Sequence, residues 1–160
     1  MKSITYGRVS MRDIVEIIHK KVESSYSTEH NIIIGTDSQN FHDTKIVLVI
    51  ALHSVGNGGI FFYEIRRVNK IKSLKQKLIK ETEISLDCAT QLIEEFEKYY
   101  EETGFDYTQL GFSIHVDAGY EGPTKLVIPE IVGWVKSCGY DCKVKPYSFA
   151  ASSIADMLSK

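Results

Sequence analysis

The sequence predicts one α/β domain built on a mixed five-stranded sheet, and three features of the chain predict it. Helical periodicity comes first, over residues 10–26; three β-branched runs then follow through short turns; and from residue 73 onward helices alternate with strands. Strands joined by short turns pair antiparallel, whereas strands joined through helices pair parallel. We therefore expect one domain over residues 1–160, with residues 31–160 as its core and the sheet antiparallel on one side only.

The first half of the chain predicts one helix and three strands. Ser10 is a suitable N-cap for the helix at residues 10–26, because Asp13 stands three residues later and completes a variant of the capping box. Strands are expected at residues 31–37, 45–55 and 60–68. The run Gly-Asn-Gly-Gly at residues 56–59 is typical of the turn in a hairpin, so the second and third strands should pair directly.

The second half predicts alternating helices and strands. A long helix should cover residues 73–102 and end at Gly104. The elements expected after it are a strand at 111–117, a helix at 124–138, a strand at 141–146 and a helix at 149–158. Pro129 falls inside the second of these helices, so that helix should either begin later or bend at the proline.

Composition excludes several classes of protein. The chain has 19 basic and 21 acidic residues, a net charge of −2 and 43% hydrophobic residues, which is ordinary globular usage. No apolar run approaches the length of about 20 residues that a membrane helix needs, and the first residues do not form a secretory signal. Three cysteines give no disulfide framework. We expect a cytoplasmic protein with no membrane partner.

Charge is distributed unevenly along the chain. Residues 66–80 carry seven basic side chains and no acid, whereas residues 81–102 carry eight acids and one lysine. Such a segment is often only a solvated surface. It is also the best candidate for contact with a nucleic-acid backbone, because lysine and arginine bind phosphate. The residues assigned to this contact are Arg66, Arg67, Lys70 and Lys72.

Two aspartates stand at matching ends of two expected strands. Asp37 closes the strand at 31–37, and Asp117 closes the strand at 111–117. Parallel neighbours lie about 4.8 Å apart, so two such carboxylates would meet at the carboxyl edge of the sheet, where open α/β sheets bind ligands. Either aspartate alone could simply cap a turn. As a pair they would repel each other, and a divalent cation would relieve that repulsion.

The long helix offers a third carboxylate. At 100° per residue, Glu81 lies about 60° from the centre of the apolar face, whereas Glu83 lies almost opposite that face. A glutamate near a buried stripe is costly unless it is paired or binds a metal, so Glu81 is the candidate. Asp156, in the last expected helix, is a fourth and weaker candidate, because a solvent-facing acid explains it equally well.

Three further polar residues stand near these acids. Ser38 and Gln39 follow Asp37 directly and could contact phosphate or water, although turn formation also explains them. His115 is expected on the same face of its strand as Asp117, where it could orient substrate or assist a proton transfer. A lone histidine in a strand is more often a hydrogen-bonded core residue.

Four strings of residues carry a resemblance to a known family. They are Gly-Thr-Asp-Ser-Gln at 35–39, Lys-Glu-Thr at 80–82, Ile-His-Val-Asp at 114–117 and Ser-Phe-Ala-Ala-Ser-Ser-Ile-Ala-Asp at 148–156. Together they resemble the YkuK family, a bacterial group of ribonuclease H-like proteins, over residues 31–160. The resemblance implies an RNase H-like fold: five strands in the order 3-2-1-4-5, the second antiparallel, with helices on both faces.

The resemblance also implies an activity. Catalytic members of this fold hold two Mg²⁺ or Mn²⁺ ions with four acids and hydrolyse the phosphodiester bonds of nucleic acid. The matching positions here are Asp37, Glu81, Asp117 and Asp156. The resemblance makes Asp156 a stronger candidate for the site than its own sequence context does. The predicted function is therefore a two-metal nuclease acting on RNA, DNA or a hybrid.

Two other functions stay open. The first is a nucleic-acid-binding module on the same fold that has lost catalysis. The second is a phosphate-handling relative of the actin-like ATPases, since the strings at 35–38 and 116–119 resemble phosphate loops. Those ATPases need two such domains around the nucleotide, and this chain has the length of one. The sequence predicts neither the substrate within the nucleic acids nor the oligomeric state.

Overall fold

The computed structural model describes residues 1–27 and 29–148. Its helices are α1 (Met11–Ser24), α2 (Leu74–Thr103) and α3 (Ile128–Ser137), with a short 3₁₀ turn at Tyr107–Gln109. Its strands are β1 (Lys2–Ser3), β2 (Gly7–Arg8), β3 (His30–Asn40), β4 (Thr44–Ser54), β5 (Gly59–Val68), β6 (Gly111–Val116) and β7 (Asp141–Lys143). The helix expected at residues 149–158, and with it Asp156, lies outside the described residues.

The sheet is mixed as predicted, but it has more strands than expected. Its order is β2-β1-β5-β4-β3-β6-β7, in which β4 runs antiparallel to both of its neighbours while β3, β6 and β7 are parallel. The five strands from β5 to β7 therefore follow the order 3-2-1-4-5. The prediction of five strands was wrong within the described chain, because residues 2–8 form a small hairpin that turns over residues 4–6, enters β2 at Gly7 (φ 73°) and pairs with β5 at Tyr63.

Local sequence signals place most of the element ends. The Ser10 side chain accepts a hydrogen bond from the backbone of Asp13, whose side chain in turn accepts one from the backbone of Ser10, so the capping box is present. Glycines in the left-handed region turn the β4–β5 hairpin and end α2. Pro129 lies in the first turn of α3, so of the two expected outcomes the helix begins later.

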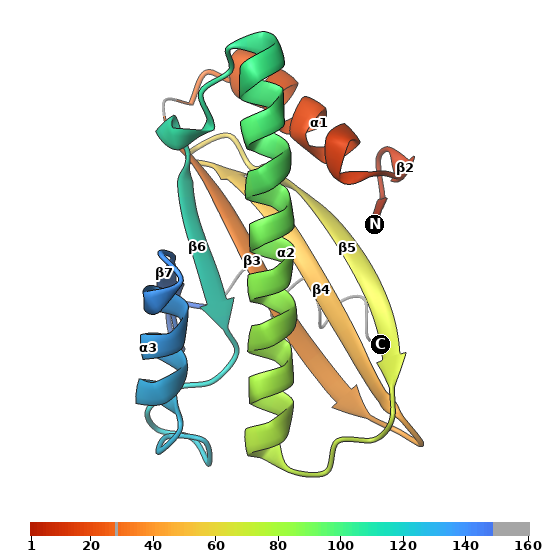
Figure 1. Cartoon of the computed structure of the whole chain (residues 1–160), viewed down its shortest axis with the longest axis vertical. Helices are drawn as coiled ribbons and strands as arrows, with labels where there is room; N and C mark the ends of the chain where they lie inside the picture. The colour runs from red at the N-terminus through yellow and green to blue at the C-terminus, as the bar shows by residue number, and fades with distance from the viewer. Residues whose placement is uncertain (28, 149–160) are drawn as a thin grey trace.

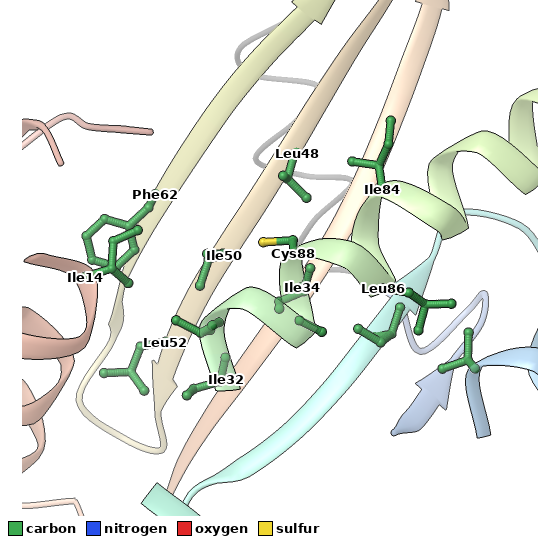
Figure 2. Packing of buried hydrophobic residues seen from close by; sticks show 14 of the residues in the cluster. Ile14, Ile32, Ile34, Leu48, Ile50, Leu52, Phe62, Ile84, Leu86 and Cys88 are labelled. Carbon is green, nitrogen blue, oxygen red and sulfur yellow. The ribbon is translucent and has the colours of Figure 1, made fainter. Parts of the chain in front are cut away.

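One large core holds the helices on the sheet. Figure 1 shows α2 lying lengthwise across one face of the sheet, with α1 near one of its ends and α3 near the other. Alternate residues of the strands point toward α2, and Figure 2 shows Ile34, Leu48 and Ile50 gathered beneath Cys88 of that helix. Burial of these side chains fixes where α2 crosses the sheet, and therefore where its polar first turns lie.

The other face of the sheet carries a second, smaller cluster, which includes Ile33, Val47 and Val49. All three described helices belong to the first cluster, so they cover one face only. The resemblance implies helices on both faces; the described residues have none on the second face, so that part stays a prediction.

A buried hydroxyl pair joins α2 to the central strand. The Thr36 and Ser85 hydroxyls lie 2.6 Å apart, and both residues are buried. A buried hydroxyl without a partner loses the hydrogen bonds that it made with water, so each side chain depends on the other. The pair lies one helical turn from Glu81 and one residue from Asp37, and it helps fix their relative position.

We expect Thr36→Val and Ser85→Ala each to lower the free energy of unfolding by about 1–3 kcal/mol, because each leaves one buried hydroxyl unpaired. The double variant should be less destabilised than the sum of the two, because no unpaired hydroxyl remains. Urea denaturation followed by circular dichroism measures all three. Simple additivity would show that the hydroxyl pair does not couple the helix to the strand.

Candidate functional site

Asp37 and Asp117 stand at the end of the parallel ladder between β3 and β6. That ladder ends at Thr36 opposite Val116, so each aspartate is the first residue beyond it on its own strand. The expected matching of the two strand ends is confirmed. The expectation that the strand ends at Asp37 was wrong: β3 continues to Asn40, because β4 still pairs with it there. Beyond the ladder, β3 pairs with no described strand on the β6 side.

Glu81 reaches this point from the second turn of α2. The Ser38 hydroxyl donates to Glu81 Oε1 at 2.7 Å, and the Ser38 backbone N–H donates to Asp37 Oδ1 at 2.9 Å. Ser38 therefore connects two of the predicted acids. The sequence predicted only that Ser38 lies near the site, and the structure shows which atoms it contacts. Glu83 is exposed, as the helical geometry predicted, and it pairs with Lys80.

Burial and mutual repulsion disfavour the ionised forms of two of these acids. Burial, followed by the charge of Asp117, raises the pKa of Asp37 to about 6. Burial raises the pKa of Glu81 to about 8, with the charge of Asp37 adding to it and the hydrogen bond from Ser38 opposing it. The protein therefore stores electrostatic free energy here at neutral pH, and a cation placed among the carboxylates would release it.

A lysine that the sequence analysis did not single out lies against Asp117. Lys145 Nζ is 3.2 Å from Asp117 Oδ1, and the lysine side chain is 59% exposed. The Lys145 backbone N–H also donates to the Ala118 carbonyl at 2.9 Å. A Cβ on Gly119 would come within 3.1 Å of the Lys145 Cβ, so the glycine permits this close approach. No pattern in the sequence brings residue 145 next to residue 117; only the fold does.

The acids line a cleft of about 850 Å³. β3 supplies Asp37 and Ser38, the end of β6 leads to Asp117, and the start of α2 supplies Leu74, Lys77, Leu78 and Glu81. The rest of the wall comes from two loops, at residues 118–124 and 144–147. The cleft thus lies at the carboxyl edge of the parallel strands, where the sequence placed it.

The donor set fits Mg²⁺ or Mn²⁺. Carboxylate oxygens are the ligands that these hard cations prefer, and among the described residues the buried Asp117 Oδ1 has its ion pair with Lys145 but no well-aligned hydrogen bond. Within residues 1–27 and 29–148, however, no three histidine, cysteine or acidic side chains stand close enough to ligate one ion. Asp37, Asp117 and Glu81 would hold a cation only if their side chains turned toward a common point.

The other polar candidates lie at different depths. Gln39 is exposed and is not among the residues that line the cleft. His115 lies in the interior, 6% exposed, and burial lowers its pKa to about 4, so its imidazole is neutral at pH 7. This placement favours a core role for His115. A substrate role for either residue stays a prediction.

The candidate phosphate contacts in the basic segment, residues 66–80, fall into two groups, one with acidic partners and one in the connection to α2. Arg66 pairs with Glu64, and Arg67 pairs with Asp43, so these two guanidinium groups already have acidic partners. Lys70 and Lys72 are exposed in the connection from β5 to α2, which leads directly to the helix turns that line the cleft. Of the predicted phosphate contacts, the two lysines are therefore the better placed.

Comparison with known proteins identifies the family of the chain. The model of the Ribonuclease H-like family matches residues 11–160, so the chain belongs to that family. The chain is 29% identical to the uncharacterized protein YkuK of Bacillus subtilis (strain 168) over 164 residues, which covers 99% of this chain and 95% of YkuK. The resemblance stated from the sequence is thus confirmed. No solved structure matches the chain significantly.

Among the described helices, none combines the length and apolar character needed to cross a membrane. The cytoplasmic location expected from the cysteine count stays a prediction.

The raised pKa of Glu81 predicts how stability depends on pH in the absence of metal. Because folding favours the protonated acid, stability from this group is full below its ordinary pKa of 4.5 and is lost as pH rises toward 8. Relative to Glu81→Gln, the wild-type free energy of unfolding should fall by a few kcal/mol, in order of magnitude, between pH 5 and about pH 8. Urea unfolding in EDTA measures this.

The matched control for this pH dependence is Glu83→Gln, which changes an exposed acid on the same helix. It should follow the wild-type curve. A Glu81→Gln curve parallel to wild type would mean that Glu81 titrates as a solvated acid and that the site does not store the repulsion inferred here.

Proposed function

We propose that this protein is a metal-dependent nuclease that hydrolyses phosphodiester bonds with two Mg²⁺ or Mn²⁺ ions. The observation that carries the proposal is the pair of aspartates at the end of the β3–β6 ladder, with Glu81 above them in the same cleft. Membership of the ribonuclease H-like family supports it. Asp156 is included as the fourth acid from the resemblance alone.

The residues of the cleft would have three roles: holding the ions, orienting the acids and binding phosphate. Asp37 and Asp117, with Glu81 and Asp156, would hold the ions, which when bound neutralise the phosphate and activate the attacking water. Ser38 orients Glu81 through its hydrogen bond and fixes Asp37 through its backbone N–H. Lys145 would exchange its contact with Asp117 for a phosphate oxygen of the substrate, because an ion among the carboxylates repels the ammonium group.

We expect Asp117→Asn to abolish metal-dependent cleavage without unfolding the protein, since it removes an acid but keeps the shape of the side chain. The assay uses labelled single-stranded and duplex RNA and DNA, an RNA–DNA hybrid and a four-way junction, each with Mg²⁺, Mn²⁺ or EDTA. Glu83→Gln is the matched control and should cleave like wild type. Full activity of Asp117→Asn would overturn the proposed mechanism.

Salt dependence tests the contacts to the nucleic-acid backbone. The observed binding constant should fall steeply with salt concentration, because each phosphate contact releases counterions. Lys70→Ala and Lys72→Ala should each reduce the slope of log K against log salt by about one. Arg66→Ala and Arg67→Ala should change it less, because their guanidinium groups already pair with Glu64 and Asp43. Fluorescence anisotropy between about 50 and 200 mM salt measures these slopes. A binding constant that does not change with salt would reject the contact.

A nucleic-acid-binding module without catalysis is the second candidate. The favouring observation is that no three acids of the described chain gather around one point, while Lys145 lies against Asp117. Binding of nucleic acid and metal without cleavage of any substrate in the panel would favour this candidate over the nuclease.

A further inference from the structure

Two exposed tyrosines stand on the wall of the acidic cleft. Tyr120 is 55% exposed and Tyr147 is 70% exposed, and both line the same cleft as Asp37 and Asp117. Large aromatic side chains are usually at least partly buried, because each can remove about 150–250 Å² of surface from water. Tyr6, Tyr26 and Tyr100 are exposed too, but they do not line the cleft. It is the placement of Tyr120 and Tyr147 beside one set of acids that points to a ligand covering both rings.

The loops that carry the tyrosines are held against each other. The Lys145 N–H donates to the Ala118 carbonyl at 2.9 Å, which joins the two loops. Within the second loop, the Tyr147 N–H donates to the Val144 carbonyl at 2.8 Å. Gly119, directly before Tyr120, packs against Lys145. Both rings are thus attached to backbone that is tied at the site, so a ligand gains contact without first ordering two free loops.

The charges of the cleft indicate what that ligand is. Lys77 and Lys145 place ammonium groups in the lining, next to acids that suit a divalent cation. Cations together with exposed aromatic rings are the combination by which proteins bind single-stranded nucleic acid: the cations follow the phosphates and the bases stack on the rings. In a duplex the base faces are already covered by their neighbours, so a ring on the cleft wall has nothing to stack on.

We propose that the cleft binds unpaired nucleotides, with Tyr120 and Tyr147 stacking on bases next to the phosphate that lies at Asp37 and Asp117. This inference rests on the proposed function for the nucleic acid, and it names the substrate as a single strand or an unpaired segment rather than a continuous duplex.

The test compares oligonucleotides with and without bases. Labelled single-stranded 12-mers of RNA and of DNA, their duplexes, and an abasic strand of about that length are titrated by anisotropy in Ca²⁺, whose oxygen-ligand preference suits the acids. The wild-type protein should bind the single strands more tightly than the duplex or the abasic strand. Tyr120→Ala and Tyr147→Ala should each weaken single-strand binding by roughly 5- to 100-fold, the loss expected for one stacked base.

Two controls separate stacking from damage to the fold. Tyr120→Phe and Tyr147→Phe keep the ring and should retain wild-type affinity. Tyr26→Ala removes a tyrosine that is 99% exposed but does not line the cleft, and it should change nothing. The alanine variants should bind the abasic strand as wild type does, because only the bases contact the rings.

The outcomes are distinct from those of the cleavage assay. Equal wild-type affinity for single strand and duplex, or unchanged binding in both alanine variants, overturns the stacking inference while leaving a duplex nuclease possible. Selective binding of single strands through the tyrosines, with no cleavage of any substrate, supports the inference and contradicts the nuclease. A failure of all nucleic acids to bind overturns the inference directly.

Discussion

The site depends on the repulsion between two carboxylates that the sheet forces together. Asp37 and Asp117 follow directly on the last paired residues of β3 and β6, so the hydrogen-bonded ladder fixes how near they lie. Neither can withdraw far without breaking that register. Burial, and after it the charge of Asp117, raises the pKa of Asp37, and a positively charged ligand would relieve the repulsion between the two acids. In the described chain Lys145 supplies part of this positive charge, with its Nζ 3.2 Å from Asp117 Oδ1.

The long helix α2 forms one wall of the cleft that contains these two aspartates. Its apolar face packs on β3 and β4, and the Thr36–Ser85 hydroxyl pair holds it beside the strand. Because the core sets the position of α2, the helix must bring Glu81 to the aspartates even though burial raises the pKa of that acid to about 8. Stability is thus given up at neutral pH to hold the third carboxylate in place, which is common where a site serves binding or catalysis.

Local patterns in the sequence predicted most of the fold, and global contacts account for the rest. The capping box at Ser10 and the β4–β5 turn follow from neighbours within four residues, and the facing of Glu81 follows from the apolar stripe of a single helix; the structure has all three. The hairpin at residues 2–8 was missed because two-residue strands have too few positions to show a pattern. Lys145, Tyr120 and Tyr147 were missed because their place at the site comes from the packing of two loops, which no spacing reveals.

The most direct test of the central repulsion is the stability of wild type and Asp117→Asn, measured by urea unfolding at neutral pH in EDTA and again in Mn²⁺. In EDTA, Asp117→Asn should be at least as stable as wild type, because the charge that opposes Asp37 is gone. In Mn²⁺ wild type should gain stability that the variant does not gain, so that wild type becomes the more stable of the two proteins. An identical difference between the two proteins in both conditions would contradict the account.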